Sequence, residues 1–297
     1  MQRFIPTNKN RNTHVLVTEY NWPIEEYLKG FAIVVYVNHM NDMHNIKMHI
    51  DDSTMIHCFV YQDKYASLET LELNQDAGGS PVVLIINRLG QFRDVYQKIH
   101  LLRQINAFVF FSGAESTACT DAQILASLGV HTGITLEPEA PLSDSILDLI
   151  TYNFYSPRPH ADIEPFATME KYYDGESYVS PNLAKLIDPN RYIHVGKGCR
   201  IAFSKEELDN GNLIGEDISL LRDEKLQDLV FEKEHEWQKM FVDNHPCTYC
   251  PAFRVCMGYF AVQREKGRCK EVMTELLEAI EFKKSLNNNN KTERCQI

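Results

Sequence analysis

Several features that assign proteins to familiar functional classes are missing from this sequence of 297 residues. It contains no apolar run of the roughly 18 residues that a membrane-spanning helix needs. Its first residues lack the apolar stretch of a signal peptide. Lys and Arg number 30 against 41 Asp and Glu, which gives a net charge of -11, and no dense basic run occurs. We therefore expect a cytoplasmic protein that binds neither membranes nor nucleic acid.

Sequence motifs of common catalytic sites are also absent. There is no H-E-x-x-H zinc motif and no G-x-S-x-G nucleophile elbow, and the 11 histidines are dispersed. The segment Asp76–Ser80 contains two glycines but precedes a predicted strand, so it indicates a turn rather than a phosphate-binding loop. Glu137 and Glu139 follow a predicted strand end, where α/β proteins place ligands, but solvated loop carboxylates are the simpler interpretation. The sequence therefore favours a non-enzymatic function, and an active site at the strand ends stays an alternative.

What the sequence does contain is a cluster of cysteines. Cys247, Cys250, Cys256 and Cys269 fall within 23 residues and follow the pattern C-x2-C-x5-C-x12-C. In a reducing compartment such clustering indicates a metal site rather than disulfides. Thiolates hold iron–sulfur clusters and Zn²⁺. A structural Zn²⁺ site with four thiolate ligands is the alternative to a cluster, although zinc sites usually pair two short knuckles and the x5 arm departs from that pattern.

The residues around these cysteines suit a buried, charged metal group. Nearby cations would offset the negative charge of a thiolate-bound cluster: Arg254, Lys266, Arg268 and Lys270. Nearby apolar residues would exclude water, which tunes the potential of a cluster: Phe253, Val255, Tyr259 and Phe260.

Two other cysteines have structural interpretations. Cys58 lies in a predicted strand and Cys119 at the start of a predicted helix. A helix start favours a thiolate, but buried core cysteines are the more common case, so we expect both to be core residues.

Hydrophobic patterning predicts an α/β protein, because apolar strands alternate with amphipathic helices and such a run forms a parallel sheet. The predicted strands are 14–19, 31–37, 45–50, 55–61, 81–86, 107–111, 130–136, 151–155 and 199–203. The predicted helices are 21–30, 92–104, 120–128, 144–150, a broken helical region over 217–242, and 272–282. Residues 156–190 are expected to be an irregular linker, Asn210-Gly211 a hairpin turn, and 286–297 a disordered tail.

The C-x2-C-x5-C core and the later Cys269 resemble the SPASM domain, the auxiliary-cluster domain of radical-SAM peptide-modifying enzymes. Gly198-Cys199 and Asn210–Leu213 resemble the segment that leads into the family's cysteine loop, so the resemblance covers roughly residues 195–284. It implies that Cys247, Cys250, Cys256 and Cys269 hold one auxiliary 4Fe-4S cluster. The gap before Cys269 is shorter than is common in the family. The βα run upstream resembles part of a radical-SAM barrel more loosely.

The sequence departs from the family in two ways. Glu216 and Phe260 stand where a second auxiliary cluster would need cysteines, so Cys199 is left without partners. The radical-SAM signature C-x3-C-x2-C does not occur, since only Cys58 and Cys119 precede Cys199 and they are 61 positions apart. Without it no S-adenosylmethionine is expected. The combination resembles the degenerate pseudo-radical-SAM proteins of Bacteroidales-type peptide-modification systems, and equally the SPASM partners of grasp-with-spasm systems.

These observations and the resemblance together define the expected protein. Its fold would be a degenerate (β/α) barrel or an open parallel sheet, followed by a small SPASM-like domain. The expected parts are an N-terminal α+β part (1–79), a barrel-like part (80–190), an iron–sulfur domain (191–284) and the tail (285–297). The resemblance implies a non-catalytic accessory protein in the maturation of ribosomally made peptides. It would bind a precursor peptide or a partner maturase, with the cluster as a structural staple or an electron relay. The alternative is a zinc-stapled interaction module without a redox role.

Overall fold

A computed structural model of the protein describes residues 14–19, 28–39, 41–50, 52–69, 71–72, 80–113, 115–181, 186–263 and 268–294. Its strands are β1 (Val15–Glu19), β2 (Ala32–Val37), β3 (Met55–Ser67), β4 (Val82–Arg88), β5 (Ala107–Ser112), β6 (His131–Thr135), β7 (Ile163–Glu164), β8 (Tyr192–Val195) and β9 (Ile201–Ala202). Its α-helices are α2 (Asp42–His49), α3 (Phe92–Gln104), α4 (Ala118–Ser127), α5 (Asp144–Tyr155), α6 (Phe166–Tyr172), α7 (Lys205–Asp209), α8 (Lys225–Glu234), α9 (Lys239–Val242), α10 (Phe253–Cys256) and α11 (Cys269–Arg294).

All nine strands belong to one sheet, in the order β7-β6-β5-β4-β3-β2-β1-β8-β9. Every neighbouring pair is parallel except β8 and β9, which are antiparallel. The first seven strands therefore follow one another in sequence order, as in a (β/α) barrel, but β7 and β9 do not pair within the described residues. The predicted α/β class is confirmed, in the form of an open, mostly parallel sheet.

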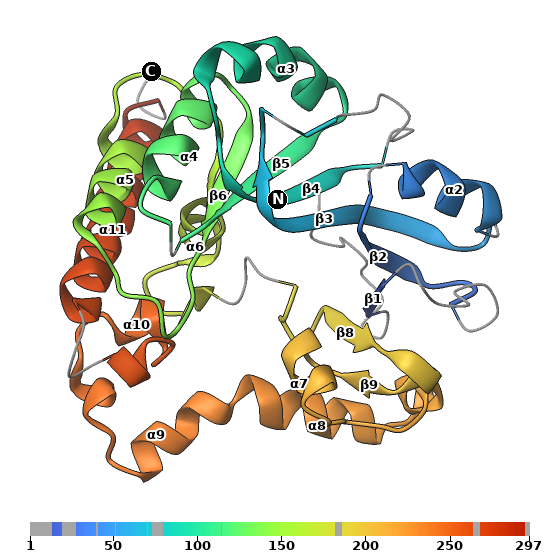
Figure 1. The fold of residues 1–297 in the computed structure, drawn as a ribbon. Coiled ribbons are helices and arrows are strands. Elements are labelled where there is room, and N and C mark those ends of the chain that lie inside the picture. The colour runs from blue at the N-terminus through green and yellow to red at the C-terminus, as the bar shows by residue number, and fades with distance from the viewer. Residues whose placement is uncertain are drawn as a thin grey trace.

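The helices cover one face of this sheet (Figure 1). The large hydrophobic core joins alternate strand residues such as Leu16, Val35 and Phe111 to residues of α3, α4, α5 and α11. The other face carries the intervening strand residues, among them Val34 and Cys58, in a separate cluster that contains no α-helical residue among those the structure describes. Right-handed crossovers between successive strands explain this, because each one places its helix on the same face when strands are added in one direction.

The predicted strand at 45–50 is wrong, because the structure forms helix α2 there. β2 and β3 are parallel neighbours, and a parallel connection requires a crossover rather than a hairpin. Met43 and Ile46, three residues apart, are the buried residues of this helix. Asp42 in the first turn and Lys47 in the last turn also complement the helix dipole.

Four further predictions differ from the structure. The predicted strand at 151–155 is wrong: it is the second half of α5, where Asn153 and Phe154 are buried. Residues 286–294, predicted as part of a disordered tail, continue helix α11 to Arg294. The predicted linker 156–190 contains β7 and α6, and the predicted hairpin turn Asn210-Gly211 instead follows α7. The predicted helix 21–30 lies mostly outside the described residues.

β8 and β9, the last two strands of the sheet, lie in the lower part of Figure 1 with the chain that follows them. There β8, β9 and α7 are followed by α8 and α9, which lead across to α10 and α11. The predicted boundary between 1–79 and 80–190 falls between β3 and β4, which are paired neighbours in the sheet. Among the described residues, no helix is long and apolar enough to span a membrane.

Candidate functional site

The four clustered cysteines lie on or directly beside three helical elements: the turn 246–249, α10 and α11. Cys247 is in the 3₁₀ turn Pro246–Tyr249, and Cys250 follows it directly. Cys256 is the last residue of α10, and Cys269 is the first residue of α11. All four are partly buried, whereas Cys58, Cys119 and Cys199 are fully buried.

Backbone hydrogen bonds shape the C-x2-C turn. The amide of Cys247 donates to Nδ1 of His245 at 3.2 Å, so this ring nitrogen is unprotonated. The amide of Cys250 donates to the carbonyl of Cys247 at 2.9 Å, and the amide of Phe253 to the carbonyl of Cys250 at 3.0 Å. Pro246 occupies the start of the turn, where no amide proton is needed. The chain therefore holds the first two cysteines on one tight turn.

The Cys256 sulfur is wrapped by the backbone that follows it. Met257 and Gly258 both have positive φ angles, 49° and 77°. This left-handed turn directs the amides of Gly258 and Phe260 at the Cys256 sulfur, and both bonds lower the pKa of its thiol. Burial is the larger effect and raises that pKa to about 11, so the free thiol is protonated at neutral pH. Amide donors to a sulfur are the groups that stabilise a metal-bound thiolate.

Three of the four sulfurs are electrostatic neighbours. The Cys269 and Cys247 thiols both raise the pKa of Cys256, after the larger effect of burial. Cys250, Cys256 and Cys269 also pack against the main hydrophobic core. The four thiols do not form a metal-binding arrangement, however. Within the residues that the structure describes, no three His, Cys, Asp or Glu side chains are arranged to hold a metal ion. The residue types, the amide donors and the proximity fit a thiolate-bound metal, and ligation requires the thiol side chains to turn toward a common centre.

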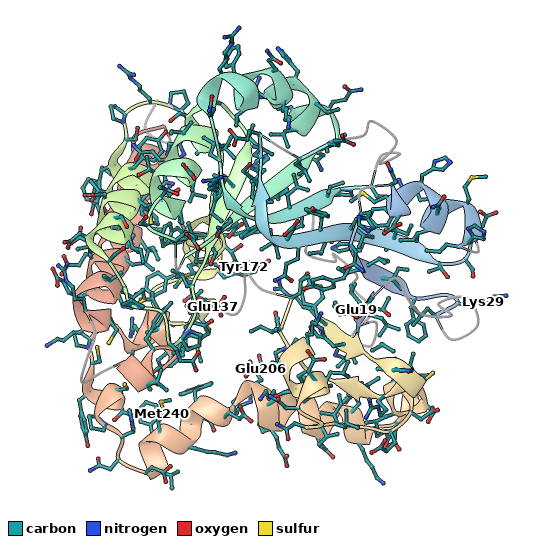
Figure 2. The ribbon with its side chains drawn as sticks, viewed as in Figure 1. Glu19, Lys29, Glu137, Tyr172, Glu206 and Met240 are labelled. Atoms are coloured by element: carbon teal, nitrogen blue, oxygen red, sulfur yellow. The ribbon has the colours of Figure 1, made fainter. Side chains whose placement is uncertain are left out.

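The cysteine segment docks on the sheet through Tyr259. Its hydroxyl donates to the backbone carbonyl of Leu136, just after β6, at 2.7 Å. Burial raises the pKa of this tyrosine, and Glu137 and Glu139 raise it further. Figure 2 labels Glu137 above this segment. The two glutamates interpreted as solvated loop acids therefore lie near the cysteine site.

Two of the four cations expected to balance a cluster, Arg254 and Arg268, make other contacts. Arg268 pairs with Asp144 at the start of α5 and with Glu271 at 2.6 Å. Arg254 donates to the carbonyl of Gly175 and, through its side chain, bonds Tyr173. Lys266 lies outside the described residues. Three of the four apolar residues expected to exclude water are buried: Phe253, Val255 and Phe260.

The other cysteines that the structure describes are not part of this segment. Cys58 on β3 is fully buried on the sheet face opposite the helices, and burial raises the pKa of its thiol. Cys119 in α4 is buried as well, and burial raises its thiol pKa more than its hydrogen bond to Ser145 lowers it. Both are core residues, as expected. Cys199 sits in the 3₁₀ turn between β8 and β9, where burial and then Asp217 raise its pKa.

Residue spacing identified the four cysteines but missed the groups that arrange them. Met257 and Gly258 supply the left-handed turn, and Tyr259 supplies the bond to Leu136. The Gly two positions after Cys256 was an available signal, because Gly favours positive φ. Nothing local to Tyr259 reveals a partner 123 positions away.

Replacing Tyr259 with Phe tests the docking of this segment. The change removes one partly buried hydroxyl and its bond to Leu136, so we expect the free energy of unfolding to fall by about 1 kcal/mol. The control Tyr249→Phe alters a residue that is 76% exposed and should have a smaller effect. Urea denaturation of both variants measures the difference. Equal losses would contradict the assigned role of the Tyr259 hydroxyl.

Comparisons of the chain with protein-family models, with curated proteins and with solved structures found no match.

Proposed function

We propose that Cys247, Cys250, Cys256 and Cys269 bind one 4Fe-4S cluster in a non-catalytic accessory protein. The protein would act in the maturation of ribosomally made peptides, in the cytoplasm, by binding a precursor peptide or a partner maturase. A bound cluster would supply a structural cross-link or a one-electron centre. The chain itself supplies the thiol ligands, two amide donors to one sulfur, and a buried apolar surround.

The observation that carries this proposal is the environment of Cys256. Two amides point at its sulfur, and two of the other three cysteines influence its charge. A core cysteine such as Cys119 has neither feature in the described structure. A structural zinc site would use the same four ligands and is the alternative.

Partner binding is supported by an aromatic strip beside the cysteines. The rings of Phe231, His235, Trp237 and Phe241 contact one another in series along α8 and α9. Tyr178, from the segment before β8, and the buried Phe253 of α10 pack against Trp237. Phe231 is 62% exposed and Phe241 is 47% exposed. Contiguous exposed aromatic surface of this kind is typical of protein–protein contact sites.

Metal analysis of anaerobically prepared protein tests the proposal. We expect about four iron and four sulfide per chain, with the visible absorption of an iron–sulfur cluster. The variant Cys256→Ala should lose this metal, whereas Cys119→Ser, which can keep the bond to Ser145, should retain it. A colourless protein with one zinc per chain would replace the cluster with the zinc alternative. If the protein binds no metal after reconstitution, both the cluster and the zinc site are contradicted.

A further inference from the structure

A cavity of about 440 Å³ opens far from the cysteines, at the carboxyl ends of β1, β2 and β8. Its walls are the last residues of β1, Tyr36 of β2, the end of β8 with the turn that follows it, and one side of α7. Figure 2 labels Glu19 on β1 and Glu206 on α7, the two elements on either side of this cavity. The volume falls within the range of small-molecule sites.

The strand order explains why a cavity forms here. β1 lies between β2 and β8 and is parallel to both. After β1 the chain forms β2, which lies on one side of the β1–β8 pair. After β8 the chain forms β9, which lies on the other side of that pair. The two neighbouring strand ends thus lead the chain in opposite directions and leave a crevice between them. Open α/β sheets place ligands outside the carboxyl ends of their strands where neighbouring connections diverge. Here the diverging connections are the link from β1 to β2 and the hairpin from β8 to the antiparallel β9.

The walls of this crevice are fixed by hydrogen bonds. Ser204 caps α7 by accepting from the amide of Glu207 at 3.1 Å, and the Glu207 carboxylate accepts from the amide of Phe203 at 3.1 Å. Glu207 also pairs with Lys233 of α8 at 2.7 Å. Leu208 of α7 also packs closely on Gly196, which follows β8. A Cβ added at Gly196 would lie 2.2 Å from the Leu208 side chain. The cavity is therefore formed before any ligand arrives.

Some charged side chains that line the cavity have ion-pair partners among the described residues, and others have none. Lys205 pairs with Glu19, and its nitrogen lies 5.7 Å from the centre of the Tyr36 ring. The Lys197 ammonium and the terminal nitrogens of Arg200 have no hydrogen bond or ion pair with another described residue. The Arg200 side chain bonds through Nε alone, to the backbone carbonyl of Lys197 at 3.1 Å. Asp209, at the far end of α7, is the remaining charged residue of the lining and is exposed.

Lys197 and Arg200 thus lie on one short turn, and neither side chain is paired with a carboxylate of the described residues. A guanidinium pairs with carboxylates and phosphates through two parallel hydrogen bonds, and an adjacent ammonium strengthens the attraction. The rest of the lining offers an apolar surface from Val17, Tyr36 and Leu208. We propose that this cavity binds a small organic anion, a carboxylate or a phosphate monoester, with its anionic group on Lys197 and Arg200 and its apolar body against Tyr36.

Isothermal titration calorimetry on the full chain tests this with four probes. Phenyl phosphate and benzoate each combine an anion with a ring, whereas inorganic phosphate lacks the ring and phenol lacks the anion. We expect saturable binding of at least one aryl anion, with inorganic phosphate and phenol about tenfold or more weaker. The tighter of the two aryl anions then identifies the anionic group as phosphate or carboxylate.

Matched variants locate the binding. Lys197→Ala and Arg200→Ala should each weaken the bound aryl anion about tenfold or more, because each removes a charge-assisted contact. Lys225→Ala, an exposed lysine on α8, should leave the affinity unchanged. Thermal unfolding checks that the variants fold, and Lys197 is exposed enough to be replaced without loss of packing. The proposal is overturned if neither aryl anion binds saturably, or if Lys197→Ala binds as tightly as the native protein.

Discussion

Replacing Phe111 with Ala is expected to lower the free energy of unfolding by about 3–5 kcal/mol, the range for removing a buried aromatic ring. Phe111 is fully buried on β5, on the face that the helices cover. Its neighbours on adjacent strands are Ile86 and Ile134, which belong to the same core. The ring therefore spans three strands, and its loss leaves a cavity that close-packed β-branched neighbours fill only in part.

The matched control is Phe231→Ala. Phe231 is 62% exposed on α8, so the same chemical change removes little buried surface and should cost about 1 kcal/mol or less. Urea denaturation followed by circular dichroism compares the two variants, with the slope of the transition checked for a change in mechanism. If the two losses are similar, Phe111 does not occupy the centre of the core.

The parallel sheet was predictable because its strands carry their own signal. Runs such as Val82–Ile86 and Phe108–Phe111 are continuously apolar, as both faces of these strands are covered. The helices between them show one apolar side, for example Val95, Ile99 and Leu102. Local pattern and final structure agree there because the crossover helices pack directly on the strands they connect.

The errors arose where tertiary contacts decide the structure. β8 was missed because three of its four residues pair with β1, 177 positions earlier (192 − 15), and no local pattern indicates that partner. Residues 45–50 form a helix because the parallel pairing of β2 with β3 requires a crossover, which overrides an alternating pattern.

In the candidate site, too, local features could be predicted from the sequence and features that depend on the tertiary structure could not. The sequence was enough to select Cys247, Cys250, Cys256 and Cys269 as candidate ligands, because the spacing between ligands is a local feature. The amide donors to Cys256 depend on the φ angles of Met257 and Gly258, and the docking on Leu136 depends on the position of β6. The cavity beside β1 could not be foreseen, since it exists only because β8 joins the sheet next to β1.

Acidification is expected to destabilise the protein through His194. This residue of β8 is 4% exposed, and its Nε2 donates to the carbonyl of Leu186 at 2.7 Å. Burial lowers the pKa of His194 to about 4, against a usual value near 6.5. The hydrogen bond to Leu186 and the charge of Glu207 raise this pKa, and the charge of Lys205 lowers it further, but burial is the largest effect. Because the unfolded state binds the proton first, stability is complete above pH 6.5 and falls as the pH drops toward 4. The expected loss from this one group is about 3 kcal/mol at pH 4.

The variant His194→Gln isolates this effect, because other groups also titrate over the same range. Glutamine keeps an N–H that can reach the Leu186 carbonyl but has no proton to gain between pH 7 and pH 4. Urea denaturation at several pH values should therefore show about 3 kcal/mol less acid-induced loss in this variant than in the native protein. The control His44→Gln, at an exposed position of α2, should retain the native pH profile. If His194→Gln loses stability on acidification as steeply as the native protein, His194 is not held neutral by its burial beneath α7.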